Sequence, residues 1–195
     1  MTNNEYITLL INHIKKDVLL TESDIIALTK IIEIRELNKK EFLIQPNETS
    51  NSMNFIAKGC MRSFYLDEDA QEHTLQLGIE EWWINDLYSY LSRKKSRMYV
   101  QALEPTILVQ LPRLKLEQLY LEVPAISHFF RIKIQNAYVA IQERVIDSMS
   151  DEAYDRYKDF IKSYRDIEQR VPQYIIASYL GVTPEFLSYL RKKHS

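Results

Sequence analysis

Residues 170–195 constrain the fold more than any other stretch of the chain. Pro172 suits the first position of a helix. An apolar helical pattern runs from there up to Leu180, and Gly181 follows it directly, as at a helix end that turns through the left-handed conformation. Thr183 is a good N-cap for a second helix, with Pro184 in the first helical position. This spacing predicts two short helices joined by a tight turn.

The small side chain of Ala177 allows the two helices to cross closely, and Leu187 and Leu190 give the second helix an apolar stripe. This is the pattern of a helix-turn-helix, whose second helix enters the major groove of DNA. An ordinary helical hairpin is the alternative. We favour DNA binding because four positions match and because residues 191–193 are all basic.

The distribution of charge supports this interpretation. The net charge of the chain is −2, but residues 170–195 contain four Arg or Lys and one Glu. The C-terminal stretch therefore carries +3 and the preceding residues −5. Such an asymmetry is typical of a basic binding segment attached to a larger acidic part of the chain.

Composition excludes several other classes of protein. With 195 residues, 46% apolar and 27% charged, the chain is typical of a globular protein with room for two modest domains. No apolar run is long enough to span a membrane, and residues 1–10 do not resemble a signal peptide, so we expect a cytoplasmic protein without a membrane partner. The single cysteine, Cys60, excludes an internal disulfide.

No residue pattern predicts a metal site, a cofactor or catalysis. The histidines are scattered, and no Ser-His-Asp or Cys-His arrangement is present. We therefore expect no metal, no cofactor and no enzymatic activity. The histidines are His13, His73, His128 and His194.

Between residues 42 and 111 the sequence consists of short β-rich segments separated by turn residues. Closely spaced strands of this kind predict an antiparallel sandwich or roll. Residues 82–92 are rich in aromatic side chains and favour a short helix among the strands. The expected strands are Phe42–Ile44, Met53–Ala57, Met61–Leu66, His73–Leu77, Met98–Leu103 and Ile107–Leu111.

Helices are expected on both sides of the β region. Residues 5–16 have an apolar helical face, and Thr21 followed by Asp24 resembles the capping box of a second helix. Residues 113–121 form a further short helical segment. Ser150 is a good N-cap for a helix that extends to Tyr164.

The longest periodic segment runs from Pro124 to Met149. Its apolar residues recur every three or four positions, as they do in a seam between paired helices. We therefore expect dimerisation through Phe130, Ile134, Ala137, Ile141 and Val145.

The order of these elements and two motifs resemble the Crp/Fnr family of transcription regulators. Residues 54–62, NFIAKGCMR, are similar to the family's "FI..G..R" hairpin, and residues 170–185, RVPQYIIASYLGVTPE, are close to those of a short-form branch. The resemblance covers nearly the whole chain. It implies an α+β fold in which an N-terminal antiparallel β roll, a double-stranded β-helix or jelly roll, has flanking helices. The expected domains are a sensor of the cyclic-nucleotide-binding type (1–123), a long dimerisation helix (124–149) and a helix-turn-helix domain (150–195).

The resemblance also implies an effector pocket in the roll. Cyclic-nucleotide-binding members hold the phosphate with a Gly-Glu pair at a helix start and an Arg-Ser or Arg-Thr pair. This chain has Asn85-Asp86 and Ser96-Arg97 in those places, and a shift of one residue along a strand turns a side chain to the opposite face. We therefore expect no response to cyclic nucleotides, and an unidentified small-molecule effector instead. The expected ligand-binding residues are Trp83, Asn85, Asp86, Leu87, Arg97 and Met98.

In the family the second helix reads DNA through an Arg-Glu pair and a further Arg one turn later. Here Glu185 is retained, but Pro184 and Tyr189 occupy the arginine positions. Glu185 is suited to cytosine N4, the neighbouring side chains to thymine methyl groups or phosphates, and the basic end to the DNA backbone. The expected DNA-binding residues are Gln173, Thr183, Glu185, Phe186, Ser188, Tyr189, Arg191, Lys192 and Lys193, with Arg165 and Arg170 adding to the same surface.

The leading hypothesis is a homodimeric regulator whose partners are double-stranded DNA, RNA polymerase and an unidentified small-molecule effector. Pro184 and Tyr189 motivate an alternative, a ligand-sensing or protein-interaction module whose degenerate helix-turn-helix no longer binds a specific operator. An enzyme built on the roll ranks third.

Overall fold

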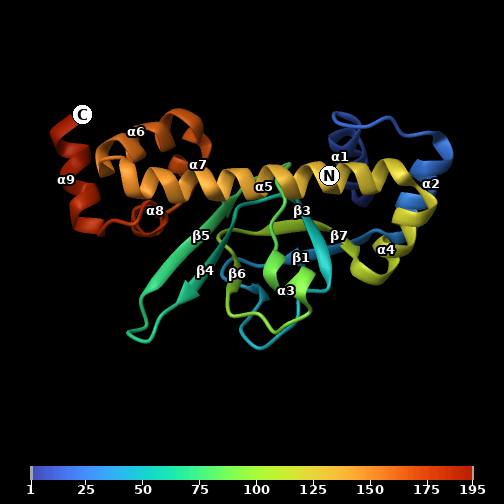
Figure 1. The fold of residues 1–195 in the computed structure, drawn as a ribbon, viewed down its shortest axis with the longest axis horizontal. Coiled ribbons are helices and arrows are strands. Elements are labelled where there is room, and N and C mark those ends of the chain that lie inside the picture. Colours follow the sequence, from blue (N-terminus) through green and yellow to red (C-terminus); the bar gives the residue numbers. More distant parts are fainter. Residues whose placement is uncertain (1, 195) are drawn as a thin grey trace.

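We describe the computed structural model of the chain over residues 2–194. One long helix, α5 (Pro124–Ser150), runs along most of the molecule (Figure 1). The strands lie beneath its middle, with α1, α2 and α4 at one end and α6 to α9 at the other. The remaining helices are α1 (Asn3–Lys15), α2 (Glu22–Ile31), α3 (Leu87–Ser92), α4 (Arg113–Glu122), α6 (Ala153–Ser163), α7 (Arg165–Arg170), α8 (Gln173–Leu180) and α9 (Pro184–His194).

The strands form two antiparallel sheets, with the orders β1-β7-β3 and β2-β6-β4-β5. Apolar side chains from both sheets, among them Ile56, Met61 and Leu108, are fully buried in a shared core. The expected α+β fold and β roll are confirmed, and every expected strand is present. The strands are β1 (Glu33–Leu37), β2 (Phe42–Ile44), β3 (Ser52–Lys58), β4 (Met61–Leu66), β5 (Glu72–Gly78), β6 (Tyr99–Ala102) and β7 (Thr106–Pro112).

The turn between β3 and β4 requires its glycine. Gly59 has φ +107°, a conformation that side chains with a Cβ rarely adopt. A Cβ there would also overlap Thr106 Oγ1 and lie 2.9 Å from the carbonyl oxygen of Pro105. The turn of the NFIAKGCMR hairpin therefore tolerates only glycine without strain.

The N-terminal helices and the first half of α5 cover the three-stranded sheet. Leu10, Ile14, Phe55 and Phe129 are fully buried in the core that they share. The expected capping box of α2 is present, because Asp24 N–H donates to Thr21 Oγ1 at 3.2 Å and Thr21 N–H donates to Asp24 Oδ2 at 2.8 Å.

Three expectations about helices are corrected. The helix expected over residues 82–92 begins only at Leu87, because the preceding residues are extended and hydrogen-bond to β3. Ser150 does not cap α6: it is the last residue of α5, and its hydroxyl donates to the carbonyl of Ile146. Pro172 precedes α8 instead of occupying its first turn.

None of the helices within residues 2–194 is both long enough and apolar enough to cross a membrane.

His13 lies in the core between α1, β3 and α5. Its ring packs against Phe55 and Phe129, with centroids 5.0 and 6.0 Å apart, and its side chain is only 11% exposed. Burial lowers its pKa from the ordinary value of 6.5, and the positive charge of Lys133 lowers it further. The carboxylate of Glu81, 3.7 Å from Nδ1, compensates in part.

This environment predicts that the folded protein is destabilised by mild acid. Because the pKa of His13 is lower in the folded state, the unfolded chain takes up the proton first, and stability falls as the pH drops below about 6.5. His13→Gln should weaken this dependence in urea denaturation curves between pH 7.5 and 5. His128→Gln, at an exposed position, is the control, and an equal effect of both substitutions would contradict the prediction.

Candidate DNA-binding interface and effector region

The C-terminal motif folds as a helix-turn-helix. Helix α8 ends at Leu180 and its C-cap is Gly181, whose φ of +71° is the left-handed conformation expected from the sequence. Phe186 N–H donates to Thr183 Oγ1 at 3.2 Å, so Thr183 caps α9. The local sequence therefore sets both the turn and the start of the second helix.

The two helices pack through small and apolar side chains. Ala177 is completely buried, and Leu187 and Leu190 turn inward from α9. The core of the motif also includes Tyr157 and Phe160 of α6. The predicted stripe of α9 thus faces the domain, and the opposite face is exposed to solvent.

The opposite face of α9 presents Glu185, Phe186, Ser188 and Tyr189 to solvent. The rings of Phe186 and Tyr189 stack side by side, with centroids 6.2 Å apart and planes inclined by 24°. Lys192 and Lys193 are exposed at the far end of the helix. The face is thus aromatic over its first two turns and basic over the last.

Besides Thr183, which caps α9, the expected DNA-binding set includes Arg191 and Gln173, which have partners within the domain. The guanidinium of Arg191 lies 3.7 Å from the carboxylate of Glu168 in α7. Gln173 is half-buried, and its side-chain amide donates to the same carboxylate at 3.4 Å. Both side chains therefore also hold α7 against the motif.

The expectation that Arg170 adds to the DNA-binding surface is wrong, because its side chain points to the roll and not to the exposed face of α9. Its guanidinium binds both oxygens of Glu80, at 2.7 and 3.0 Å, and a carboxylate oxygen of Glu104 at 2.5 Å. Burial alone would raise the pKa of Glu80, but hydrogen bonds from Arg170 and from Gly59 N–H hold it below its ordinary value. Arg165, by contrast, is exposed at the start of α7.

Strand β5 provides a second attachment for the helix-turn-helix. It is the edge strand of its sheet, so one side of its backbone lacks a strand partner. The hydroxyl of Ser178 in α8 accepts from Thr74 N–H at 2.8 Å and donates to the carbonyl of Glu72 at 2.6 Å.

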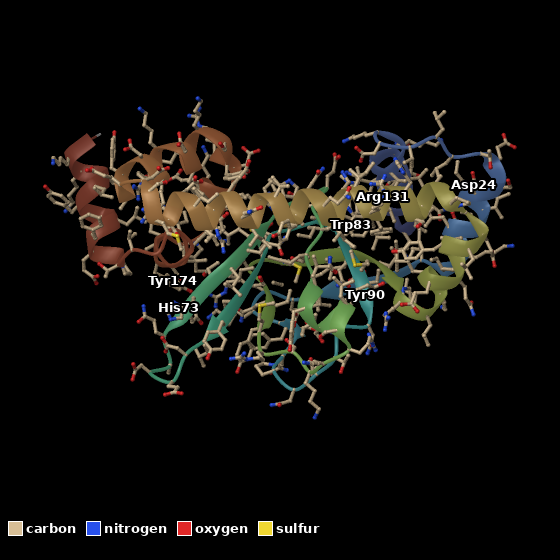
Figure 2. The ribbon with its side chains drawn as sticks, viewed as in Figure 1. Asp24, His73, Trp83, Tyr90, Arg131 and Tyr174 are labelled. Carbon is tan, nitrogen blue, oxygen red and sulfur yellow. The ribbon has the colours of Figure 1, made fainter. Side chains whose placement is uncertain are left out.

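Arg144 of α5 donates to the carbonyl of Leu75, and its guanidinium lies 4.9 Å from the ring centroid of Tyr179. Figure 2 shows this end of the molecule, with His73 on the hairpin of β4 and β5 and Tyr174 on α8.

The expected effector residues of the roll are largely used by the chain itself. Trp83 lies next to α5, where its ring packs against Phe55 and Phe130 (Figure 2). Asn85 Oδ1 accepts from the backbone and side-chain amides of Asn54, both at 2.9 Å. Asp86 is fully buried and caps α3 by accepting from Ser89 N–H. Leu87 packs against the core around α5.

The Ser96-Arg97 pair lies in the loop before β6 and not in a strand, so the expected shift along a strand does not account for its orientation. Ser96 is buried, and its hydroxyl accepts from Met98 N–H at 3.0 Å. Arg97 is exposed, and its guanidinium lies 5.8 Å from the ring centroid of Tyr65. Met98 is half-buried beside them.

The second half of α5 carries an exposed apolar face. Ile141 is 57% exposed and Met149 83%, and Tyr138 and Val145 lie on the same face at helical spacing. Of the expected seam, Ile134 and Ala137 are half-buried within the chain. The expectation that Phe130 belongs to the seam is wrong. Its side chain is buried in the chain's own core against Trp83 and Tyr120 and does not reach this face.

A cavity of about 450 Å³ opens between α5, α6, α8 and β5. Its wall includes Thr74, Arg144, Arg156 and Tyr179, and none of the expected effector residues lines it. Within residues 2–194, no group of three His, Cys, Asp or Glu side chains is placed to hold a metal ion.

Comparison with known proteins identifies the class of fold. Residues 34–122 match the family model of the cyclic nucleotide-binding domain. No curated protein sequence matches the chain. Solved structures of regulators match it over most of its length.

FixK2 from Bradyrhizobium japonicum has a TM-score of 0.70 at 15% identity, over 84% of each chain. The c-di-GMP responsive global regulator CLP from Xanthomonas campestris has a TM-score of 0.69 at 12% identity, over 89% of this chain and 91% of its own. The Catabolite Activator Protein of Thermus thermophilus has a TM-score of 0.58 at 16% identity, over 89% and 83%. The chain therefore contains a domain of the cyclic-nucleotide-binding type within the fold of a Crp/Fnr-type transcription regulator.

The attachment of the helix-turn-helix leads to a first mutational prediction. Arg170→Gln removes the guanidinium shared by two carboxylates of the roll and should lower the free energy of unfolding by roughly 1–2 kcal/mol, since the partly exposed pair is screened by solvent. Lys115→Gln removes an ion pair exposed on both sides and should cost less than about 0.5 kcal/mol. Urea denaturation measures both, and equal losses would contradict the prediction.

Proposed function

We propose that the chain is a DNA-binding transcription regulator that acts as a homodimer and whose β roll responds to an effector other than a cyclic nucleotide. The observation that carries the proposal is the solvent-exposed face of α9, held outward by a correctly capped helix-turn-helix. Binding of the full-length protein to duplexes from a random pool, titrated with salt, is the experiment that tests it. A DNA reader retains a recurring sequence and loses affinity steeply as the salt concentration rises.

Pro184 and Tyr189 favour a second candidate, a ligand-sensing or protein-interaction module that no longer binds a specific operator. Neither residue supplies the positive charge that would fix the helix against phosphates or guanine. Such a module would show weak binding without a recurring sequence in the same experiment.

The exposed face of α5 supports dimerisation. Burying each of its half-exposed large apolar side chains is worth roughly 1 kcal/mol, about half of the 1.5–3 kcal/mol for complete burial. Residues at this spacing pair two helices along a seam. A two-fold dimer through α5 would present two copies of α9 to successive turns of the major groove, about 34 Å apart.

Charge on this face should therefore dissociate the dimer. The double substitution Ile141→Glu and Val145→Glu places carboxylates in the proposed seam and should yield monomers in analytical ultracentrifugation. Asn136→Glu, exposed on the opposite side of α5, should leave the dimer intact. A stable dimer of the double variant would show that the interface lies elsewhere.

The basic end of α9 is proposed to contact phosphates. Lys192→Ala together with Lys193→Ala should weaken binding to all duplexes about equally and reduce the slope of log affinity against log salt by about two. Lys30→Ala together with Lys39→Ala removes two exposed charges of the N-terminal half and should leave the slope unchanged. A slope that the first pair does not alter would place these lysines away from phosphate.

The arrangement around α3 argues against cyclic nucleotides. A phosphate at the start of α3 would meet the buried carboxylate of Asp86, and the guanidinium of Arg97 is turned to solvent. Asn85 and the Oδ1 atom of Asp86 already accept internal hydrogen bonds, whereas Asp86 Oδ2 is buried without a hydrogen-bond partner.

Calorimetry with cyclic AMP and cyclic GMP at millimolar concentration should show no one-to-one binding tighter than about 10 μM, or roughly −7 kcal/mol. Binding tighter than this would contradict the expected absence of a cyclic-nucleotide response.

A further inference from the structure

The reading face of α9 is chemically restricted. Leu187 and Leu190 are buried, so the side chains available in its first two turns are Glu185, Phe186, Ser188 and Tyr189. Between Thr183 and Leu190 there is no Arg, Lys, Asn or Gln. The usual partners of guanine, Arg and Lys, and those of adenine, Asn and Gln, are therefore absent from the first two turns of this face.

What remains on this face matches pyrimidines. The carboxylate of Glu185 accepts hydrogen bonds, and cytosine N4 is the donor that cytosine presents in the major groove. The same carboxylate repels the acceptor atoms of guanine, the O4 of thymine and the N7 that lies beside the N6 donor of adenine, so it discriminates by exclusion as well as by attraction.

The aromatic pair points to thymine. The rings of Phe186 and Tyr189 are 43% and 54% exposed, and their centroids are 6.2 Å apart, roughly two base-pair steps of 3.4 Å. The C5-methyl of thymine is the apolar group that base edges offer in the major groove. Two exposed rings at this spacing can cover two methyl groups on one strand.

We propose that Phe186 and Tyr189 read thymine methyl groups, and that with Glu185 they specify a half-site whose read strand carries two thymines within three base pairs and an adjacent cytosine. The proposal rests on the proposed DNA-binding function and adds the base preference to it. A methyl group is worth about 0.8 kcal/mol when buried, so each one that is read should contribute about fourfold in affinity.

Phe186 also has another neighbour. It lines a hollow of about 400 Å³ with Gln71 and His73 of the β4–β5 hairpin, so packing against that hairpin is the alternative role. Tyr189 does not line the hollow, so the two roles are separable by mutation.

The test begins with the sequences that full-length protein selects from a random duplex pool. Each thymine of the selected half-site is then replaced singly by deoxyuridine, which removes the methyl group and retains O4. Affinity should fall about fourfold at two positions and remain unchanged at the others. Glu185→Ala should relax the preference for cytosine at one position.

Variants connect the methyl groups to the rings. In Phe186→Ala and in Tyr189→Ala, one thymine position each should lose its sensitivity to deoxyuridine, whereas Tyr189→Phe should retain it. Tyr174→Ala, which removes an equally exposed ring from α8, is the matched control and should retain both sensitivities. Thermal melting of each variant verifies that it is folded.

The outcomes separate the inference from the function on which it rests. If no duplex is bound even at low salt, both fail. If duplexes are bound without a recurring sequence, the base preference and the proposed sequence-reading function both fail. If a recurring sequence is selected but its thymines tolerate deoxyuridine, the base preference alone fails and DNA binding stands. If Phe186→Ala and Tyr189→Ala leave the deoxyuridine effect intact, the rings do not read the methyl groups and the inference is overturned.

Discussion

The free backbone edge of β5 determines where the helix-turn-helix lies. An unpaired edge strand exposes N–H and carbonyl groups that must find partners. Here a single hydroxyl, that of Ser178, satisfies one group of each kind, and Arg144 satisfies a third from α5. The ion pairs of Arg170 fix the other side of the same contact. The long helix, the roll and the helix-turn-helix thus meet at one strand, and the direction in which α9 faces depends on this contact.

Most of the fold could be predicted because its determinants are local. Turn residues separated the strands, and Gly181 and Thr183 fixed the ends of α8 and α9. Strand β1 escaped prediction because three of its five residues are charged, and it is a strand only through its pairing with β7. Likewise, the first part of the helix expected over residues 82–92 is extended, because it forms hydrogen bonds with β3, which lies far away in the sequence.

The candidate site was predictable only in part, for a related reason. Periodicity identified which face of α9 is exposed, because buried and exposed residues alternate within one element. It could not show that Arg170 binds carboxylates 66 and 90 residues away, or that Phe130 is covered by Trp83. A basic or apolar residue next to a functional surface has several possible partners, and only the tertiary structure selects among them.

The apolar core of the helix-turn-helix is shared with the roll. Cys60 and Leu77 are buried in the same cluster as Phe160, Ile176 and Leu187, and burial raises the pKa of the Cys60 thiol to about 12. The roll and the helix-turn-helix are therefore not independent domains that can be exchanged freely. A chimera that joins this helix-turn-helix domain to a foreign sensor domain would expose that apolar surface. The new sensor would have to supply an equivalent strand edge and equivalent apolar side chains to cover it. Exchange of sensors within this architecture is thus limited by surface complementarity as well as by linker length.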